Sequence, residues 1–156
     1  MASFPVLSII TWSPFVGALL IMFLARRHAL LVRWLAVAST SVSLVLSIAI
    51  YVAYDREAAG FQFYEDLPLV PALGINYQLG IDGMSLLMVL LTSVIIFAGA
   101  WASWTVKVRS QEFYALLLVL VTGVYGVFVS LDLFVLFLLY EIAQCLVGSE
   151  MCIRDS

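Results

Sequence analysis

The sequence predicts an all-α, polytopic transmembrane helix bundle with about five spans. Of its 156 residues, 65% are hydrophobic and 11% are charged, and the mean hydropathy is +1.15. Soluble domains carry about 25% charged residues. The apolar residues here gather into runs of about 20, the length of helix that crosses a roughly 30 Å hydrocarbon core. A water-soluble enzyme is therefore excluded, and lipid is the expected solvent.

The first two predicted spans form a helical hairpin. Residues 4–25 carry no charge and contain two prolines. This run is too long for a cleaved signal peptide and lacks its basic start, so we expect a retained span. A basic turn at 26–28 leads into the second run, residues 30–54. Arg33 lies near the start of that run, where its head group reaches the interface by snorkelling.

Three further spans follow the one substantial polar segment of the chain. Residues 55–78 hold acids, aromatics and two prolines, and the prolines argue against a long helix. Apolar residues then fill the runs 84–104, 113–130 and 133–147. Only Leu131 and Asp132 separate the last two runs, which predicts a tight turn and antiparallel packing.

The charges lie asymmetrically at the two ends of these spans. One end holds the bases Arg26, Arg27, Arg33, Lys107 and Arg109. The opposite end receives the acids Asp55, Glu57, Glu65, Asp66, Asp82 and Asp132, with Arg56 as its base. Because lysine and arginine accumulate on the cytoplasmic side, we expect the amino terminus outside, in a multi-pass protein of the bacterial plasma (inner) membrane.

The sequence offers no residues for a cofactor, a metal or nucleic acid. The charges form no basic stripe, so nucleic-acid binding is not expected. Cys145 and Cys152 lie among the last dozen residues and the single histidine, His28, lies in the basic turn, so no metal or disulfide spacing is present. We therefore expect any redox cofactor to belong to a partner.

Glu141 is the main candidate functional residue, because it is the one ionisable group well inside an apolar run. Nine residues of helix after Asp132 correspond to about 13 to 14 Å of rise, which places Glu141 near the bilayer midplane. A carboxylate there costs about 2.5 to 3.5 kcal/mol unless it is protonated or paired. The sequence predicts a proton relay. The alternative is a protonated acid that hydrogen-bonds a neighbouring helix, and these spans offer no lysine or second acid as partner.

Other polar and small residues are interpreted as structural. We expect Asp82 to cap the helix that follows it, and Ser110 and Glu112 to provide a cap and a dipole-complementing acid for the next one. Asp132 is expected to end the tight turn. Three glycines within spans are assigned to close helix packing: Gly99, Gly123 and Gly126.

Three segments together resemble one family. They are Tyr77-Gln78-Leu79-Gly80-Ile81-Asp82-Gly83-Met84-Ser85-Leu86, then Leu90-Leu91-Thr92, and Asp132-Leu133-Phe134 leading to Tyr140-Glu141. Over residues 1–144 the chain resembles the amino-terminal part of subunit M, an antiporter-like membrane subunit of bacterial complex I, the proton-translocating NADH-quinone oxidoreductase.

The resemblance implies a function and a set of partners. Glu141 matches the fifth-helix glutamate that the family pairs with an intramembrane lysine on a later helix. Proton transport would be driven by NADH oxidation and quinone reduction on other subunits, which carry the flavin, the iron-sulfur clusters and the quinone. The expected partners are the other membrane subunits and the bilayer, and no redox site is expected on this chain.

The end of the chain departs from the family pattern. The family continues after the glutamate with a Met-Leu-x-Pro stretch, whereas residues 145–156 turn polar and resemble translated adapter read-through. We predict that these residues are a non-native tail. The native transmembrane domain is then residues 1–144.

Two other functions remain open at this point. One is a sodium/proton antiporter subunit of the Mrp type without redox activity, which shares the fold and the fifth-helix acid. The Gly-Ile-Asp-Gly-Met-Ser motif favours the complex I subunit over it. The other is a structural helix bundle in which Glu141 only holds helices together.

Overall fold

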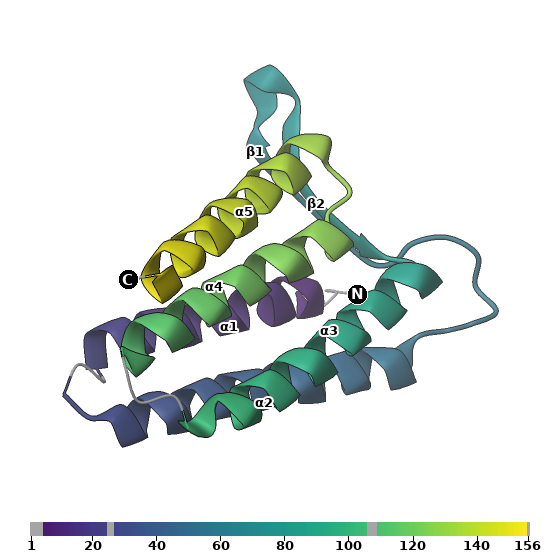
Figure 1. Cartoon of the computed structure of the whole chain (residues 1–156). Coiled ribbons are helices and arrows are strands. Elements are labelled where there is room, and N and C mark those ends of the chain that lie inside the picture. Colours follow the sequence, from purple (N-terminus) through teal and green to yellow (C-terminus); the bar gives the residue numbers. More distant parts are fainter. Residues whose placement is uncertain (1–4, 25–26, 106–108, 156) are drawn as a thin grey trace.

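The computed structural model describes residues 5–24, 27–105 and 109–155 as five long helices and one β-hairpin (Figure 1). In chain order these are α1 (Val6–Leu24), α2 (Ala29–Ala53), β1 (Gln62–Val70), β2 (Ile75–Ile81), α3 (Gly83–Ala102), α4 (Ser110–Val129) and α5 (Leu133–Asp155). Two short 3₁₀ turns, Pro71–Leu73 and Ser103–Thr105, lie at the hairpin tip and after α3. The largely helical bundle agrees with the predicted fold class.

Four of the helices are long and apolar enough to cross a membrane: Val6–Leu24, Ala29–Ala53, Gly83–Thr105 and Ser110–Val129. The chain is therefore a multi-pass membrane protein. The apolar part of α5, Leu133–Cys145, is shorter than the roughly 20 residues of a full span. The fifth span thus stays a prediction. The helix α5 itself continues past the expected end at 147 to Asp155, which leaves the prediction of a non-native tail untested.

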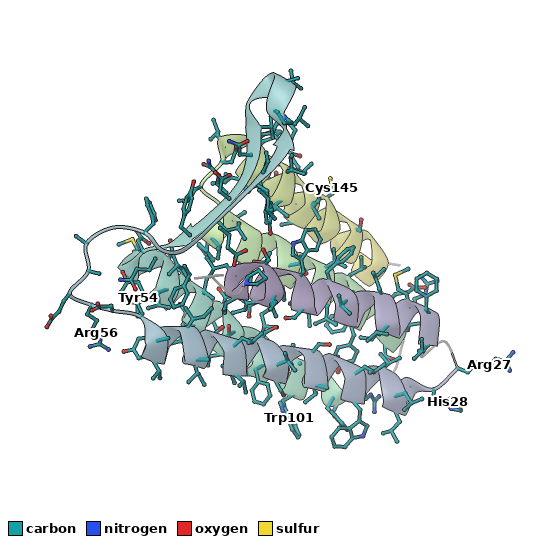
Figure 2. All side chains as sticks on the ribbon, turned by 180° about the vertical axis from the view of Figure 1, so that it is seen from behind. Arg27, His28, Tyr54, Arg56, Trp101 and Cys145 are labelled. Carbon is teal, nitrogen blue, oxygen red and sulfur yellow. The ribbon has the colours of Figure 1, made fainter. Side chains whose placement is uncertain are left out.

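Among the described residues, Arg27 and Arg109 lie at one end of the bundle and Arg56 lies at the other, while the acid Glu112 pairs with Arg109 at the first end. Figure 2 shows Arg27 and His28 in the turn between α1 and α2, and Arg56 beyond the far end of α2. Arg109 precedes α4, at the same end of the bundle as Arg27. Arg26 and Lys107, which also supported the orientation, lie outside the described residues.

Two clusters of buried side chains form the core, one in each half of the bundle. The first includes Leu7, Ile10, Ile50, Leu79, Ile81, Leu86, Val89, Val121, Tyr125 and Val129. The second includes Ala18, Ile21, Val32, Ala36, Tyr114, Ala115 and Leu118. Both contain α1, α2 and α4 residues, while the first also takes in β2 and α3. The hairpin therefore closes one end of the bundle.

The β-hairpin is the element that sequence analysis missed. Strand β1 pairs antiparallel with β2, from Gln62 opposite Ile81 to Val70 opposite Ile75. Gly74 turns the chain at φ 67°, a conformation that glycine adopts without a Cβ clash. Pro68 is tolerated because β1 is an edge strand. The hairpin was not predicted because its sequence contains prolines and charges and lacks the regular apolar–polar alternation of a strand.

The hairpin is attached to the start of α1 by a buried carboxylate. Glu65 accepts hydrogen bonds from the backbone N–H groups of Leu7, at 2.9 Å, and Ser8, at 3.4 Å, and from the Ser8 hydroxyl. These N–H groups have no partner within the first turn of the helix, and the negative charge suits the positive end of the helix dipole. Sequence analysis had placed Glu65 only among the acids at the end opposite the bases, without a partner.

A proline inside α1 is accommodated locally. Pro14 has no N–H to donate to the Ile10 carbonyl, and the Ser13 hydroxyl donates to that carbonyl instead, at 3.2 Å. Serine side chains commonly satisfy backbone groups freed by proline in membrane helices. The Ser13 hydroxyl also lies 3.1 Å from that of Ser43 on α2, which links the two helices.

Helix starts agree only partly with the predicted caps. Asp82 caps α3 by accepting a hydrogen bond from the Ser85 N–H at 2.8 Å, as predicted. Glu112 lies in the first turn of α4, also as predicted. The prediction for Ser110 was wrong, because the capping position belongs to Arg109, whose left-handed backbone starts the helix one residue earlier without a side-chain cap.

Candidate functional site

Glu141 lies within α5, about 12 Å of helix rise beyond Leu133. Its side chain is partly exposed in the isolated chain. Among the residues that the structure describes, no hydrogen bond or ion pair of Glu141 is present. The carboxyl group is thus placed in an apolar helix, and its expected partner is not among these residues.

Two glycines of α4 fix how α5 lies against the bundle. A Cβ on Gly123 would lie 2.9 Å from the Ala143 Cβ and 3.0 Å from the Leu139 carbonyl oxygen. A Cβ on Gly126 would clash with the Leu139 side chain. The packing role predicted for these glycines is confirmed. Gly99 differs, because nothing lies within 4 Å of its Cβ position.

This packing also sets the direction of Glu141. Leu139 and Ala143 are four residues apart and share the face of α5 that contacts α4. Glu141 lies two residues from each, and two residues turn an α-helix by about 200°. The carboxyl-bearing side of α5 therefore faces away from α4, and Glu141 is partly exposed there.

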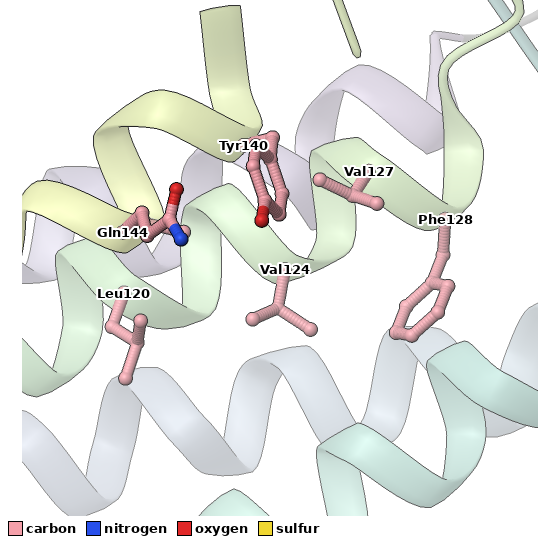
Figure 3. A pocket seen from close by; sticks show the side chains of 7 residues that line it. Leu120, Val124, Val127, Phe128, Tyr140 and Gln144 are labelled. Atoms are coloured by element: carbon pink, nitrogen blue, oxygen red, sulfur yellow. The ribbon is translucent and has the colours of Figure 1, made fainter. Parts of the chain in front are cut away.

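An apolar groove of about 310 Å³ runs between α4 and α5 beside this face (Figure 3). It is lined by Leu120, Val124, Val127, Phe128, Tyr140, Ala143 and Gln144. Tyr140 and Gln144 belong to α5. Viewed down the axis of this helix, these two residues and Glu141 lie within about 100° of one another. Tyr140 and Gln144 line the groove, and Glu141 lies outside its lining.

Asp132 fixes the start of α5 and ties it to the hairpin. One carboxylate oxygen accepts the Phe134 N–H at 2.8 Å, and the other accepts the Asn76 N–H of β2 at 3.1 Å. The Leu131 N–H donates to the Gln78 carbonyl at 2.9 Å. The tight turn predicted from the sequence is therefore present, and its two residues are hydrogen-bonded to β2.

Asp82, an acid outside the spans, is ionised more easily in the folded protein. The backbone hydrogen bond from Ser85 lowers the pKa of Asp82 below its ordinary value, because this bond favours the charged carboxylate. No group of three or more His, Cys, Asp or Glu residues suited to a metal ion occurs in the described part of the chain. Cys145 is an exposed free thiol.

Sequence analysis also missed a set of buried hydroxyl groups. Ser43, Ser47, Ser93 and Tyr125 are almost fully buried and come from α2, α3 and α4. Ser93 contacts both the Ser47 hydroxyl and the Tyr125 hydroxyl, the latter at 2.8 Å. The available signal was a serine-rich second span, since serine hydroxyls often hydrogen-bond between membrane helices.

These features define a class: a polytopic membrane helix bundle with the carboxyl group of Glu141 in the apolar part of a helix. No family model matches the chain. Curated relatives match most of it. The "NAD(P)H-quinone oxidoreductase chain 4 2" of Thermosynechococcus vestitus is 36% identical over 140 residues, 89% of this chain and 26% of the relative. The chloroplastic "NAD(P)H-quinone oxidoreductase chain 4" of Chara vulgaris is 36% identical over 143 residues, 91% of this chain and 29% of the relative. The chain therefore spans less than a third of the length of these relatives.

A solved structure shares the fold. A chain in the membrane-bound sulfane sulfur reductase, an archaeal respiratory membrane complex, matches with a TM-score of 0.77 and 23% sequence identity. The match covers 90% of this chain and 22% of that chain. The helices and hairpin described above thus have the fold of one part of a chain in a respiratory membrane complex.

Proposed function

We propose that this chain is the amino-terminal part of a proton-translocating membrane-arm subunit, of the subunit M kind, in an NADH-quinone oxidoreductase. The observation that carries the proposal is Glu141, a carboxyl group within an apolar helix, in a chain similar to curated quinone oxidoreductase subunits. Intramembrane acids of this kind mark proton pathways more often than they serve as structural contacts.

In this proposal, Glu141 accepts and releases protons while electron transfer takes place on other subunits. Moving the charged carboxylate out of water is unfavourable, so the side chain exchanges between a protonated form and a form paired with a cation. The cation would be the intramembrane lysine of a later helix, which approaches the side of α5 that faces away from α4. Flavin, iron-sulfur clusters and quinone would reside on partner subunits.

The similarity to curated quinone oxidoreductase subunits favours this function over the Mrp-type antiporter. The proposal includes a bacterial plasma membrane location with the amino terminus outside. The position of Arg27 and Arg109 at one end of the bundle, with Arg56 at the other, supports this orientation.

The test is a set of substitutions in the full-length subunit assembled into its complex. Glu141→Gln keeps the shape of the side chain and removes its proton exchange, so proton pumping driven by NADH should fall about tenfold or more. Glu141→Asp should retain part of the activity. Glu112→Gln is the matched control, since Glu112 is exposed at the start of α4 and pairs with Arg109. Normal pumping by an assembled Glu141→Gln complex would rule out the relay.

A further inference from the structure

Two buried tyrosines of α4 bind the neighbouring helix α3 at two heights. Tyr114 and Tyr125 both have 0% of their surface exposed, and each belongs to a different core cluster. They are separated by about three turns of helix, roughly 16 Å, and so lie on the same face of α4.

Tyr114 provides a hydrogen-bond donor for the backbone carbonyl groups at the end of α3. Its hydroxyl donates to the Ser103 carbonyl at 2.8 Å and lies 3.4 Å from the Ala100 carbonyl. Carbonyls in the last turn of a helix have no partner within that helix and need one from outside. The phenol of Tyr114 therefore fixes α4 against the carboxyl end of α3.

Tyr125 fixes α4 near the other end, through hydroxyl groups. Each hydroxyl has one proton to donate. The Ser93 hydroxyl donates to the Val89 carbonyl of its own helix at 2.8 Å, so the Tyr125 hydroxyl donates to Ser93, also at 2.8 Å. The Ser47 hydroxyl contacts Ser93 and lies 2.9 Å from the Ser43 carbonyl. These contacts link α4 to α3 and α2 within the buried core.

The helix α4 contacts α5 on a different face. Gly123 and Gly126 lie against Leu139 and Ala143, the residues that flank Glu141 on α5. Figure 1 shows α4 lying between α5 and the remaining helices. A rotation of α4 about its axis would displace the glycine face against which α5 packs.

We infer that Tyr114 and Tyr125 act as a two-point clamp that sets the rotation of α4 and, through its glycine face, the orientation of the helix that carries Glu141. They are positioning residues rather than proton carriers. The part of the inference that concerns Glu141 rests on the proposed function.

The first test measures helix orientation directly in the full-length subunit. Spin labels at Leu91→Cys on α3 and Leu138→Cys on α5, both exposed positions, report one distance when the other cysteines are serine. Removing one buried hydrogen bond of α4 should raise the population of a second orientation of α4 and α5 about fivefold. The double variant Tyr114→Phe/Tyr125→Phe should therefore broaden the distance distribution. Tyr125→Phe alone is the milder variant, which decides the question where the double variant does not assemble.

Tyr64→Phe is the matched control, because Tyr64 is exposed on β1 and loses the same atom. It should leave the distribution narrow. A distribution that stays equally narrow in the assembled clamp variants overturns the clamp.

The second test connects the clamp to Glu141. A changed orientation of α5 alters the surroundings of the carboxyl group, so the pH profile of proton transport should shift in Tyr125→Phe and stay unchanged in Tyr64→Phe. A loss of assembled complex alone would lower transport at every pH without a shift. An unchanged profile in a variant whose spin-label distance has moved overturns the link to Glu141. If Glu141→Gln leaves transport intact, the proposed function fails, and the distance measurement still decides the clamp.

Discussion

At the scale of single residues, three carboxylates satisfy backbone N–H groups at the starts of helices. Asp82, Glu65 and Asp132 each accept backbone N–H groups at the start of a helix. Asp82 and Asp132 cap the helix that follows them directly, so both were within reach of sequence reasoning. Glu65 caps a helix that begins 59 positions earlier in the chain, and no local pattern indicates such a partner.

Replacing Asp82 with alanine should destabilise the full-length protein by about 1 kcal/mol through loss of the α3 cap. Hydrogen bonding lowers the pKa of Asp82 in the folded state. Its stabilisation is therefore complete above the unfolded pKa, near 3.9, and is lost as the pH falls through the lower folded value. Thermal unfolding at neutral and acid pH measures both effects. The exposed Asp66 on β1, replaced by asparagine, serves as control. Equal stability of the two variants at neutral pH would contradict the cap.

At the scale of elements, the spans were predictable and the hairpin was not. Long apolar runs define α1 to α4 almost by length alone, because the bilayer sets the length of a helix. The strands β1 and β2 depend on partners: the register from Gln62 to Val70, the Glu65 contact with α1, and the pairing of Leu79 with Ser130. Contacts between distant segments leave no periodic signal in the sequence.

The contact between α4 and α5 should be sensitive to a single added side chain. Gly123→Val places atoms against the backbone of Leu139, which cannot move without shifting α5. A cost of about 1 to 3 kcal/mol is expected for such overpacking. Gly99→Val is the control, because its Cβ position is open. Thermal stability of the two purified full-length variants gives the comparison, and equal stability would show that α5 does not lie as closely as described.

At the scale of the whole molecule, the separation of charges predicts one membrane orientation. Arg27→Cys, in the turn between α1 and α2, should be labelled from the cytoplasmic side by a thiol reagent that does not cross membranes. Glu57→Cys, in the segment after α2, should be labelled from the outside. Both positions are exposed. Labelling of the two sites from one side, or from exchanged sides, contradicts the proposed orientation.

The helical fold class of the whole molecule and the position of Glu141 in a helix were both accessible from the sequence. The face of α5 that bears Glu141 was not, because it depends on Gly123 and Gly126 meeting Leu139 and Ala143. The buried hydroxyls were missed for the same reason. Serine and tyrosine occur throughout membrane helices, and only the packing identifies those that meet.

The most direct test of the account is to observe the protonation of Glu141 itself. Infrared difference spectra of the full-length, assembled complex should show a carboxyl band that changes when NADH drives quinone reduction. That band should be absent in Glu141→Gln and retained in Glu112→Gln, since a relay must gain and lose its proton during turnover. A spectrum in which Glu141→Gln removes no band that responds to turnover would contradict the role of Glu141 in proton transport.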